Sequence, residues 1–324
     1  MADVRPDVVA IGEMMGLLDP DADGPLEDVP GYRLRIAGAE GNVLINLAHL
    51  GHRTAFVSAV GVDPFGRLVT RTLSEQGVNT DHVVVDPAAP TGVFFKERLG
   101  DGQRRVYYYR GRSAAARLTP ADVDLERLGL PRVLAVSGVT LGLGDGGGLS
   151  DVARTAMSWA AASRDCVVVF DPNLRPSLWD GPRAAAEFGD ILPLIDVLLA
   201  GRDELATLMP DLETDDAAQH LSCSGVDAVV LKDGARGAVV HQAGEVTTIS
   251  PFLIERVVDS VGAGDAFAAG VISGLLHGWS VQDGARLGAV LGARAVTVSG
   301  DWEGIGAGED ARHLLEEYRS VNVQ

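Results

Sequence analysis

The segment Asp259-Ser260-Val261-Gly262-Ala263-Gly264-Asp265 comes directly before an apolar stretch that predicts a helix to about His277. Glycines let consecutive backbone N–H groups converge on one point, and the N-terminus of a helix adds partial positive charge there. The segment therefore predicts an anion-binding turn that leads into a helix.

Asp265 lies beside this turn. A carboxylate is a poor phosphate ligand because the charges repel, but it suits a base that takes the proton of a hydroxyl as the oxygen attacks a γ-phosphoryl group. The alternative is that Asp265 only complements the helix dipole. The two glycines on one side and Asp259 on the other favour the base. We therefore expect an ATP-dependent small-molecule kinase.

The rest of the chain alternates between buried strands and helices. Residues 8–12 predict a first strand, and residues 41–49 predict a helix that ends at Gly51. The pattern recurs, with strands at 55–60, 133–137, 166–170, 197–199 and 229–231 and helices near 66–76, 152–163 and 184–192. Such alternation predicts an α/β fold with a mainly parallel sheet covered on both faces, in one domain over residues 1–324.

Residues 91–112 break this alternation. Two β-prone runs flank the turn Gly100-Asp101-Gly102, which predicts a hairpin. With a strand at 33–36 it would form a small lid sheet from residues of about 13–37 and 90–113. Ligands bind at the carboxyl ends of the strands in open α/β sheets, where such a lid can close.

Composition excludes several classes of function. The 324 residues carry a formal net charge of −18, which argues against nucleic-acid or membrane partners. We find no apolar run of membrane-spanning length and no export signal, so a cytoplasmic location is expected. The two cysteines and seven histidines show no spacing typical of disulfide frameworks or metal sites.

Residues 259–265 resemble the DTxGAGD signature of the ribokinase-like (PfkB) carbohydrate kinases, with Ser260 in place of Thr. A second family motif, a glycine-rich turn followed by Asn, is similar to residues 37–42, where Ala37 replaces the first glycine. The resemblance implies a three-layer α/β/α core with a small β-sheet lid. It also implies that Asp265 is the general base and that Gly262, Ala263 and Gly264 stabilise the transferring phosphoryl group.

The same resemblance implies MgATP as the phosphoryl donor. Nucleotide contacts are implied at Asn173, Arg175, Lys232, Gly234 and Gly237. The family's NxxE motif, which positions Mg²⁺ through water, corresponds to residues 201–204. Glu204 matches, but Gly201 replaces the Asn. The alternatives are an ordinary glycine turn between strands at residues 232–237 and a plain exposed helix-start residue at Glu204.

Other polar residues point to the phosphoryl acceptor. Asn42 can offer an amide to sugar hydroxyls and Gly38 lets a ligand approach the backbone, although Asn42 can equally be a helix cap. Arg110 and Arg175 follow predicted strands, where a guanidinium suits a carboxylate. The alternative for each arginine is a surface ion pair.

Three local sequences are similar to one branch of the family, the 2-keto-3-deoxygluconate kinases. They are residues 106–114, 171–179 and 300–304. By that resemblance, Tyr108, Arg110 and Arg175 contact the acid end of the sugar and Asp301 contacts a hydroxyl. Phe94 occupies a substrate-site position where relatives often have Tyr.

We therefore expect phosphorylation of the terminal hydroxyl of a sugar acid, with 2-keto-3-deoxygluconate as the leading substrate. The alternatives are a fructokinase or ribokinase-type enzyme and a non-catalytic nucleotide- or sugar-binding regulator. A dehydrogenase is disfavoured because no GxGxxG follows the first strand. An apolar face of the lid around Val93 and Phe95 would need cover, which predicts a homodimer through the lid.

Overall fold

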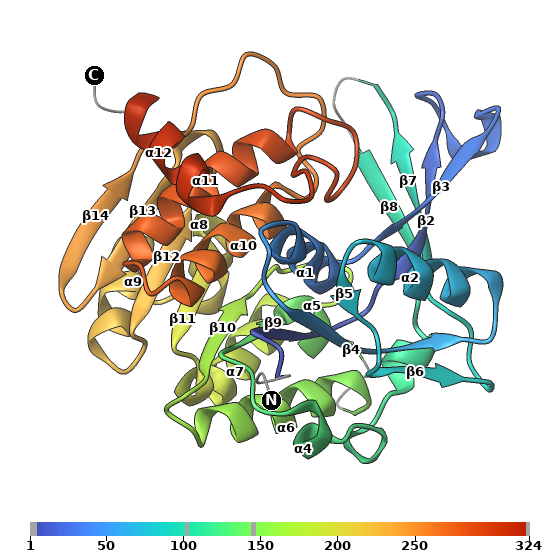
Figure 1. Ribbon diagram of the computed structural model, residues 1–324, viewed down its shortest axis with the longest axis horizontal. Coiled ribbons are helices and arrows are strands. Elements are labelled where there is room, and N and C mark those ends of the chain that lie inside the picture. The colour runs from blue at the N-terminus through green and yellow to red at the C-terminus, as the bar shows by residue number, and fades with distance from the viewer. Residues whose placement is uncertain (1–4, 101–103, 144–146, 322–324) are drawn as a thin grey trace.

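The protein, described here from a computed structural model, is a three-layer α/β/α domain with a separate small sheet beside it (Figure 1). The structure describes residues 5–100, 104–143 and 147–321. The predicted hairpin turn around Asp101 lies mostly outside these residues.

In the described part of the chain, ten strands form the central sheet, in the order β14-β13-β12-β11-β10-β9-β1-β4-β5, with β6 paired to β4. The strands are β1 (Val8–Ile11), β4 (Thr54–Gly61), β5 (Val78–Asn79), β6 (Val83–Asp86), β9 (Val133–Ser137), β10 (Val167–Asp171), β11 (Val197–Gly201), β12 (Ala228–Lys232), β13 (Ala238–Gln242) and β14 (Glu245–Ile249). The pairs from β5 to β12 are parallel, which confirms the predicted α/β class.

Helices cover both faces of this sheet. One face packs against α1 (Ala39–His49), α2 (Pro64–Glu75), α10 (Ala263–Leu276), α11 (Val281–Ala295) and α12 (Ala311–Val321). The other packs against α3 (Ala114–Arg117), α4 (Leu125–Leu128), α5 (Gly138–Leu141), α6 (Leu149–Ala161), α7 (Gly181–Ile191), α8 (Arg202–Leu208) and α9 (Thr214–Cys223). The strands are apolar on both faces and so need cover on both. In β1, Val8 and Ala10 face the first helical layer, while Val9 and Ile11 face the second.

The lid is a four-stranded sheet in the order β3-β2-β7-β8. It consists of β2 (Met15–Pro20), β3 (Tyr32–Ala37), β7 (Val93–Arg98) and β8 (Arg104–Tyr109) and rises from the core at the upper right of Figure 1. The hairpin and the β3 strand confirm the prediction. The sequence pattern predicts no strand at β2, although this strand pairs with both β3 and β7 and so joins the lid together.

The edge of the central sheet also differs from the expectation. Strands β13 and β14 pair antiparallel with their neighbours, and neither was predicted from sequence. Among the described residues, no helix combines the length and the apolar character needed to cross a membrane.

Candidate active site

The glycine-rich turn leads into α10 as predicted. Gly262 is the N-cap of α10 with a left-handed φ of 79°. A Cβ at this position would lie 1.9 Å from the carbonyl oxygen of Asp301, so only glycine fits. By helix geometry the N–H groups of Ala263, Gly264 and Asp265 have no acceptor within the helix. They form a cradle with partial positive charge that fits a phosphate group.

Asp265 is half-buried at the start of α10 and accepts a hydrogen bond from Asn42 Nδ2 at 2.7 Å. Burial raises the pKa of Asp265 to about 7; the Asn42 bond opposes this rise, and the charges of Asp171 and Asp301 add to it. A carboxylate with a pKa near neutrality suits a general base. The environment of Asp265 therefore suits a proton acceptor, and the hydrogen bond from Asn42 fixes the orientation of its carboxylate.

The Asn42 contact refines the sequence-based interpretation. Its side-chain oxygen accepts from the N–H of Gly38 only at 3.4 Å, whereas its amide donates to Asp265. Gly38 is required for packing, because a Cβ there would lie 2.2 Å from the carbonyl oxygen of Glu13. The motif at residues 37–42 thus brings α1 to the base from 223 residues away.

A half-buried ion pair lies beside the cradle. Lys232 ends β12, and its Nζ lies 2.6 Å from Asp171 Oδ2 at the end of β10. Burial lowers the pKa of Lys232, but the carboxylates of Asp171 and Glu204 outweigh burial and raise it, so the ammonium stays charged. A Cβ at Gly264 would lie 4.0 Å from Nζ. Lys232 therefore supplies positive charge beside the turn.

The turn after β12 is tightly built. Gly234 and Gly237 have left-handed φ values of 54° and 93°. A Cβ at Gly237 would meet the carbonyl oxygen of Ile249 at 2.1 Å. Asn173, which follows β10, also has a positive φ of 40°. These residues lie at the carboxyl ends of β12 and β10, as a nucleotide-side location requires.

Glu204 accepts hydrogen bonds from two backbone N–H groups, those of Leu174 at 2.9 Å and Gly201 at 2.7 Å. The Gly201 contact caps α8, as the helix-start alternative expects. A carboxylate has about four acceptor positions, so Glu204 retains room for water molecules around a metal ion. Its chemistry therefore fits a water-mediated Mg²⁺ contact.

The substrate residues predicted from the lid form a stack on its inner face. The rings of Phe94 and Tyr108 stack with centroids 5.6 Å apart, and the Arg110 guanidinium lies 5.5 Å from the Tyr108 centroid. Arg110 is buried, and its Nε donates to Glu13 Oε2 at 2.6 Å. Tyr109 points to the opposite face and is 65% exposed, as strand alternation predicts.

Arg175 and Asp301 approach Asp265 from the core. Arg175 is exposed, and its positive charge lowers the pKa of Asp265. Asp301 is buried and forms an ion pair with Lys96 of the lid. The structure thus brings Asn42, Arg175 and Asp301 around Asp265.

Several charged residues near the site were given no role from the sequence. Glu13 and Lys96 stand in apolar or β-prone runs, where a buried charge is a signal of a partner. Glu40 is buried in α1, where its Oε1 accepts from Ser137 Oγ and Thr140 Oγ1, and burial raises its pKa. Glu40, Asp171 and Asp265 line one cavity. The sequence indicates these carboxylates but not that they converge.

Comparison with known proteins places these features in context. Residues 5–305 match the model of the family described as pfkB family carbohydrate kinase. A 2-dehydro-3-deoxygluconokinase of Bacillus subtilis is 32% identical over 318 residues, covering 98% of this chain and 97% of the relative. One of Thermoproteus tenax is 34% identical over 317 residues, covering 95% and 94%. A probable chloroplastic fructokinase-6 of Arabidopsis thaliana is 29% identical, covering 91% and 78%.

Solved structures share the fold. A PfkB protein from Polaromonas is 34% identical with a TM-score of 0.83, covering 95% of this chain and 99% of that one. A putative ribokinase II from E. coli, solved in complex with ATP and Mg²⁺, is 25% identical with a TM-score of 0.87, covering 98% and 100%. The ribokinase-like arrangement of core and lid expected from the sequence is therefore confirmed.

Proposed function

Because this chain belongs to the PfkB family of carbohydrate kinases, we propose that it transfers a phosphoryl group from ATP to the terminal hydroxyl of a sugar acid. The leading substrate is 2-keto-3-deoxygluconate, with the 6-phosphate as product. The observation that carries the acid preference is the pair of Arg110 in the lid and Arg175 in the core. The similarity to two 2-dehydro-3-deoxygluconokinases supports the same choice.

Asp265 accepts the proton of the attacking hydroxyl in this proposal. Its pKa of about 7 leaves enough carboxylate at neutral pH and keeps it basic enough to take the proton. Asn42 holds one carboxylate oxygen and leaves the other for the substrate. The N–H groups after Gly262 and the Lys232 ammonium stabilise the negative charge of the transferring group.

Phosphoryl transfer of this kind uses MgATP, and the metal ion would neutralise charge on the phosphate oxygens. Glu204 would orient water around it. Asn173, Lys232, Gly234 and Gly237 would contact the nucleotide. The ATP and Mg²⁺ bound to the E. coli structure support this donor.

The acid end of the sugar would lie against Arg110, Arg175 and Tyr108. Glu13 holds the Nε side of Arg110, which leaves guanidinium N–H groups for a carboxylate. Phe94 would pack beside the sugar without a hydroxyl to donate. Asp301 would accept from a sugar hydroxyl.

A coupled assay of ADP release over a panel of sugar acids and neutral sugars tests the substrate. We expect kcat/KM for 2-keto-3-deoxygluconate to exceed the values for fructose and ribose. Preference for fructose or ribose would overturn the acid assignment and favour the fructokinase or ribokinase alternative, which the Arabidopsis relative supports. Absence of turnover with every sugar would favour a binding regulator.

We also propose a homodimer through the outer face of the lid. Val93 and Phe95 lie on this face with Tyr107 and Tyr109, which are 40% and 65% exposed. A second copy would cover these rings. Light scattering should give twice the chain mass, and a monomer mass would count against the dimer. Cytoplasmic location stays a prediction.

A further inference from the structure

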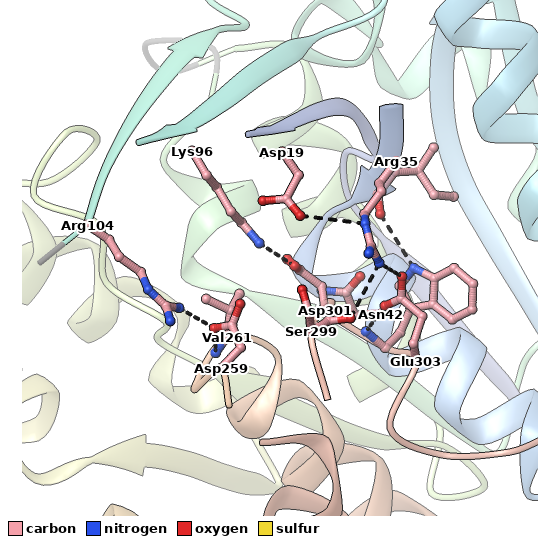
Figure 2. A network of polar contacts seen from close by, with 12 residues as sticks. Asp19, Arg35, Asn42, Lys96, Arg104, Asp259, Val261, Ser299, Asp301 and Glu303 are labelled. Carbon is pink, nitrogen blue, oxygen red and sulfur yellow. Dashed lines mark hydrogen bonds and ion pairs between the residues drawn. The ribbon is translucent and has the colours of Figure 1, made fainter. Parts of the chain in front are cut away.

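Three basic residues of the lid form ion pairs with carboxylates of the core (Figure 2). The pairs are Arg35 with Glu303, Lys96 with Asp301, and Arg104 with Asp259. Asp259 precedes the glycine-rich turn and also accepts from the N–H of Val261 at 2.9 Å. The acidic partners thus lie on two segments that flank the turn.

The Lys96 pair is the most deeply buried of the three. The side chains of Lys96 and Asp301 are 9% and 7% exposed, against 30% and 14% for Arg104 and Asp259. Both charged groups of a buried pair lose their hydration, so each charge is stabilised mainly by the other. When the lid moves away, water can solvate both groups. The pair therefore matters chiefly in the closed state.

Asp301 connects this pair to the catalytic turn. Its carbonyl oxygen occupies the space that a Cβ of Gly262 would need, so its backbone packs directly on the start of α10. Its carboxylate is also close enough to raise the pKa of Asp265. A lid residue that fixes Asp301 therefore acts on the cradle and on the base.

We propose that Lys96 is a positioning residue that couples lid closure to the catalytic turn. Its ammonium neutralises the Asp301 carboxylate when the closing lid buries that carboxylate beside Gly262. Without Lys96, closure would bury an unpaired carboxylate. Asp301 would then have to take up a proton, and lid closure would depend on pH. The kinetic consequence rests on the proposed function, whereas the closure itself does not.

The surroundings of Asp301 set the direction of this pH dependence. Burial raises its pKa, Lys96 lowers it, and the carboxylates of Glu303 and Asp259 raise it further. Arg35 and Arg104 engage those two carboxylates, and Asp265 faces Asp301 from α10. Loss of Lys96 therefore raises the pKa of Asp301. Closure is then favoured at low pH and disfavoured as pH rises.

Hydrogen–deuterium exchange of β7 and β8, without nucleotide or sugar, tests the proposal. The variants are Lys96→Met, which keeps the chain length but removes the charge, and Lys96→Arg, which keeps the charge. After correction for intrinsic rates, Lys96→Met should exchange faster than wild type at pH 8 by on the order of tenfold or more, and by less at pH 6. Lys96→Arg should stay near wild type.

Two further variants make the test specific. Arg105→Met removes a lid charge whose partner, Glu97 at 4.0 Å, is in the lid itself, so exchange should not change. In Lys96→Met/Asp301→Asn the carboxylate is gone, so the difference between pH 6 and pH 8 should disappear. Wild-type exchange in Lys96→Met at both pH values, or a pH difference that persists in the double variant, would overturn the proposal.

Kinetics separate this inference from the proposed function. With a sugar that wild type phosphorylates, the ratio of kcat/KM in Lys96→Met to that in wild type should fall between pH 6 and pH 8. A ratio constant over this range would contradict the coupling while leaving the kinase activity intact. If no sugar is phosphorylated, the proposed function fails and the exchange measurement still decides the role of Lys96.

Discussion

The catalytic turn and the lid are built in opposite ways. In the turn, the proposed phosphate cradle and the proposed base, Asp265, occupy consecutive positions at the start of α10. In the lid, Lys96 meets a partner 205 residues away, and Arg104 meets one 155 residues away. The residues proposed for the chemistry are therefore adjacent in the sequence, whereas the proposed lid closure and acid recognition depend on the tertiary fold.

Asp265→Asn should have the largest effect. The amide cannot accept the hydroxyl proton, so kcat should fall by about 10²- to 10⁴-fold. Binding of the sugar should change little, because Asn keeps the size of the side chain. Rapid-quench turnover and calorimetric titration measure the two effects. A kcat near wild type would show that another group is the base.

Gly262→Ala should impair the cradle at its first residue. The Cβ would clash with the Asp301 carbonyl and the residue would keep a left-handed φ, so the turn must shift. Misplacement of the phosphate cradle should lower kcat by about 10²-fold. Gly278→Ala, just after the far end of α10, is the matched control, since it also has a positive φ, of 72°, but open space for a Cβ. Equal losses would assign the effect to backbone strain alone.

The pH dependence should report the surroundings of the base. Because the pKa of Asp265 is raised to about 7, its active carboxylate form is lost as pH falls through that value. In wild type, kcat/KM should drop roughly tenfold for each pH unit well below 7. Asn42→Leu removes the hydrogen bond that favours the carboxylate, so the midpoint should move to higher pH. A midpoint near 4 would show that burial does not raise the pKa of the group that acts as the base.

The sequence predicts the core better than the lid for a physical reason. Buried parallel strands such as β9 and β10 are short apolar runs, and a glycine at the N-cap of α10 marks an obligatory turn. Strand β2 carries Gly16 and Pro20 and resembles a loop until its neighbours pair with it. Local pattern cannot reveal such pairing.

The same limit applies to the side chains of the site. Asp265, Lys232 and the glycines were identified from local motifs. The roles of Glu13 and Lys96 were not, because each is defined by a partner far along the chain, Arg110 and Asp301. Asn42 belongs to both groups. Its motif is recognisable in the sequence, but its hydrogen bond to Asp265 is visible only in the folded structure.

The proposed acid recognition is tested by substrate discrimination in a variant that lacks the ion pair of Arg110 with Glu13. Glu13→Gln/Arg110→Met removes both buried charges, so neither is left unpaired. We predict that kcat/KM for 2-keto-3-deoxygluconate falls by about 10- to 100-fold, mainly through KM, while the value for a neutral sugar stays near wild type. Equal losses for both substrates, or an unchanged ratio, would contradict recognition of the acid by Arg110.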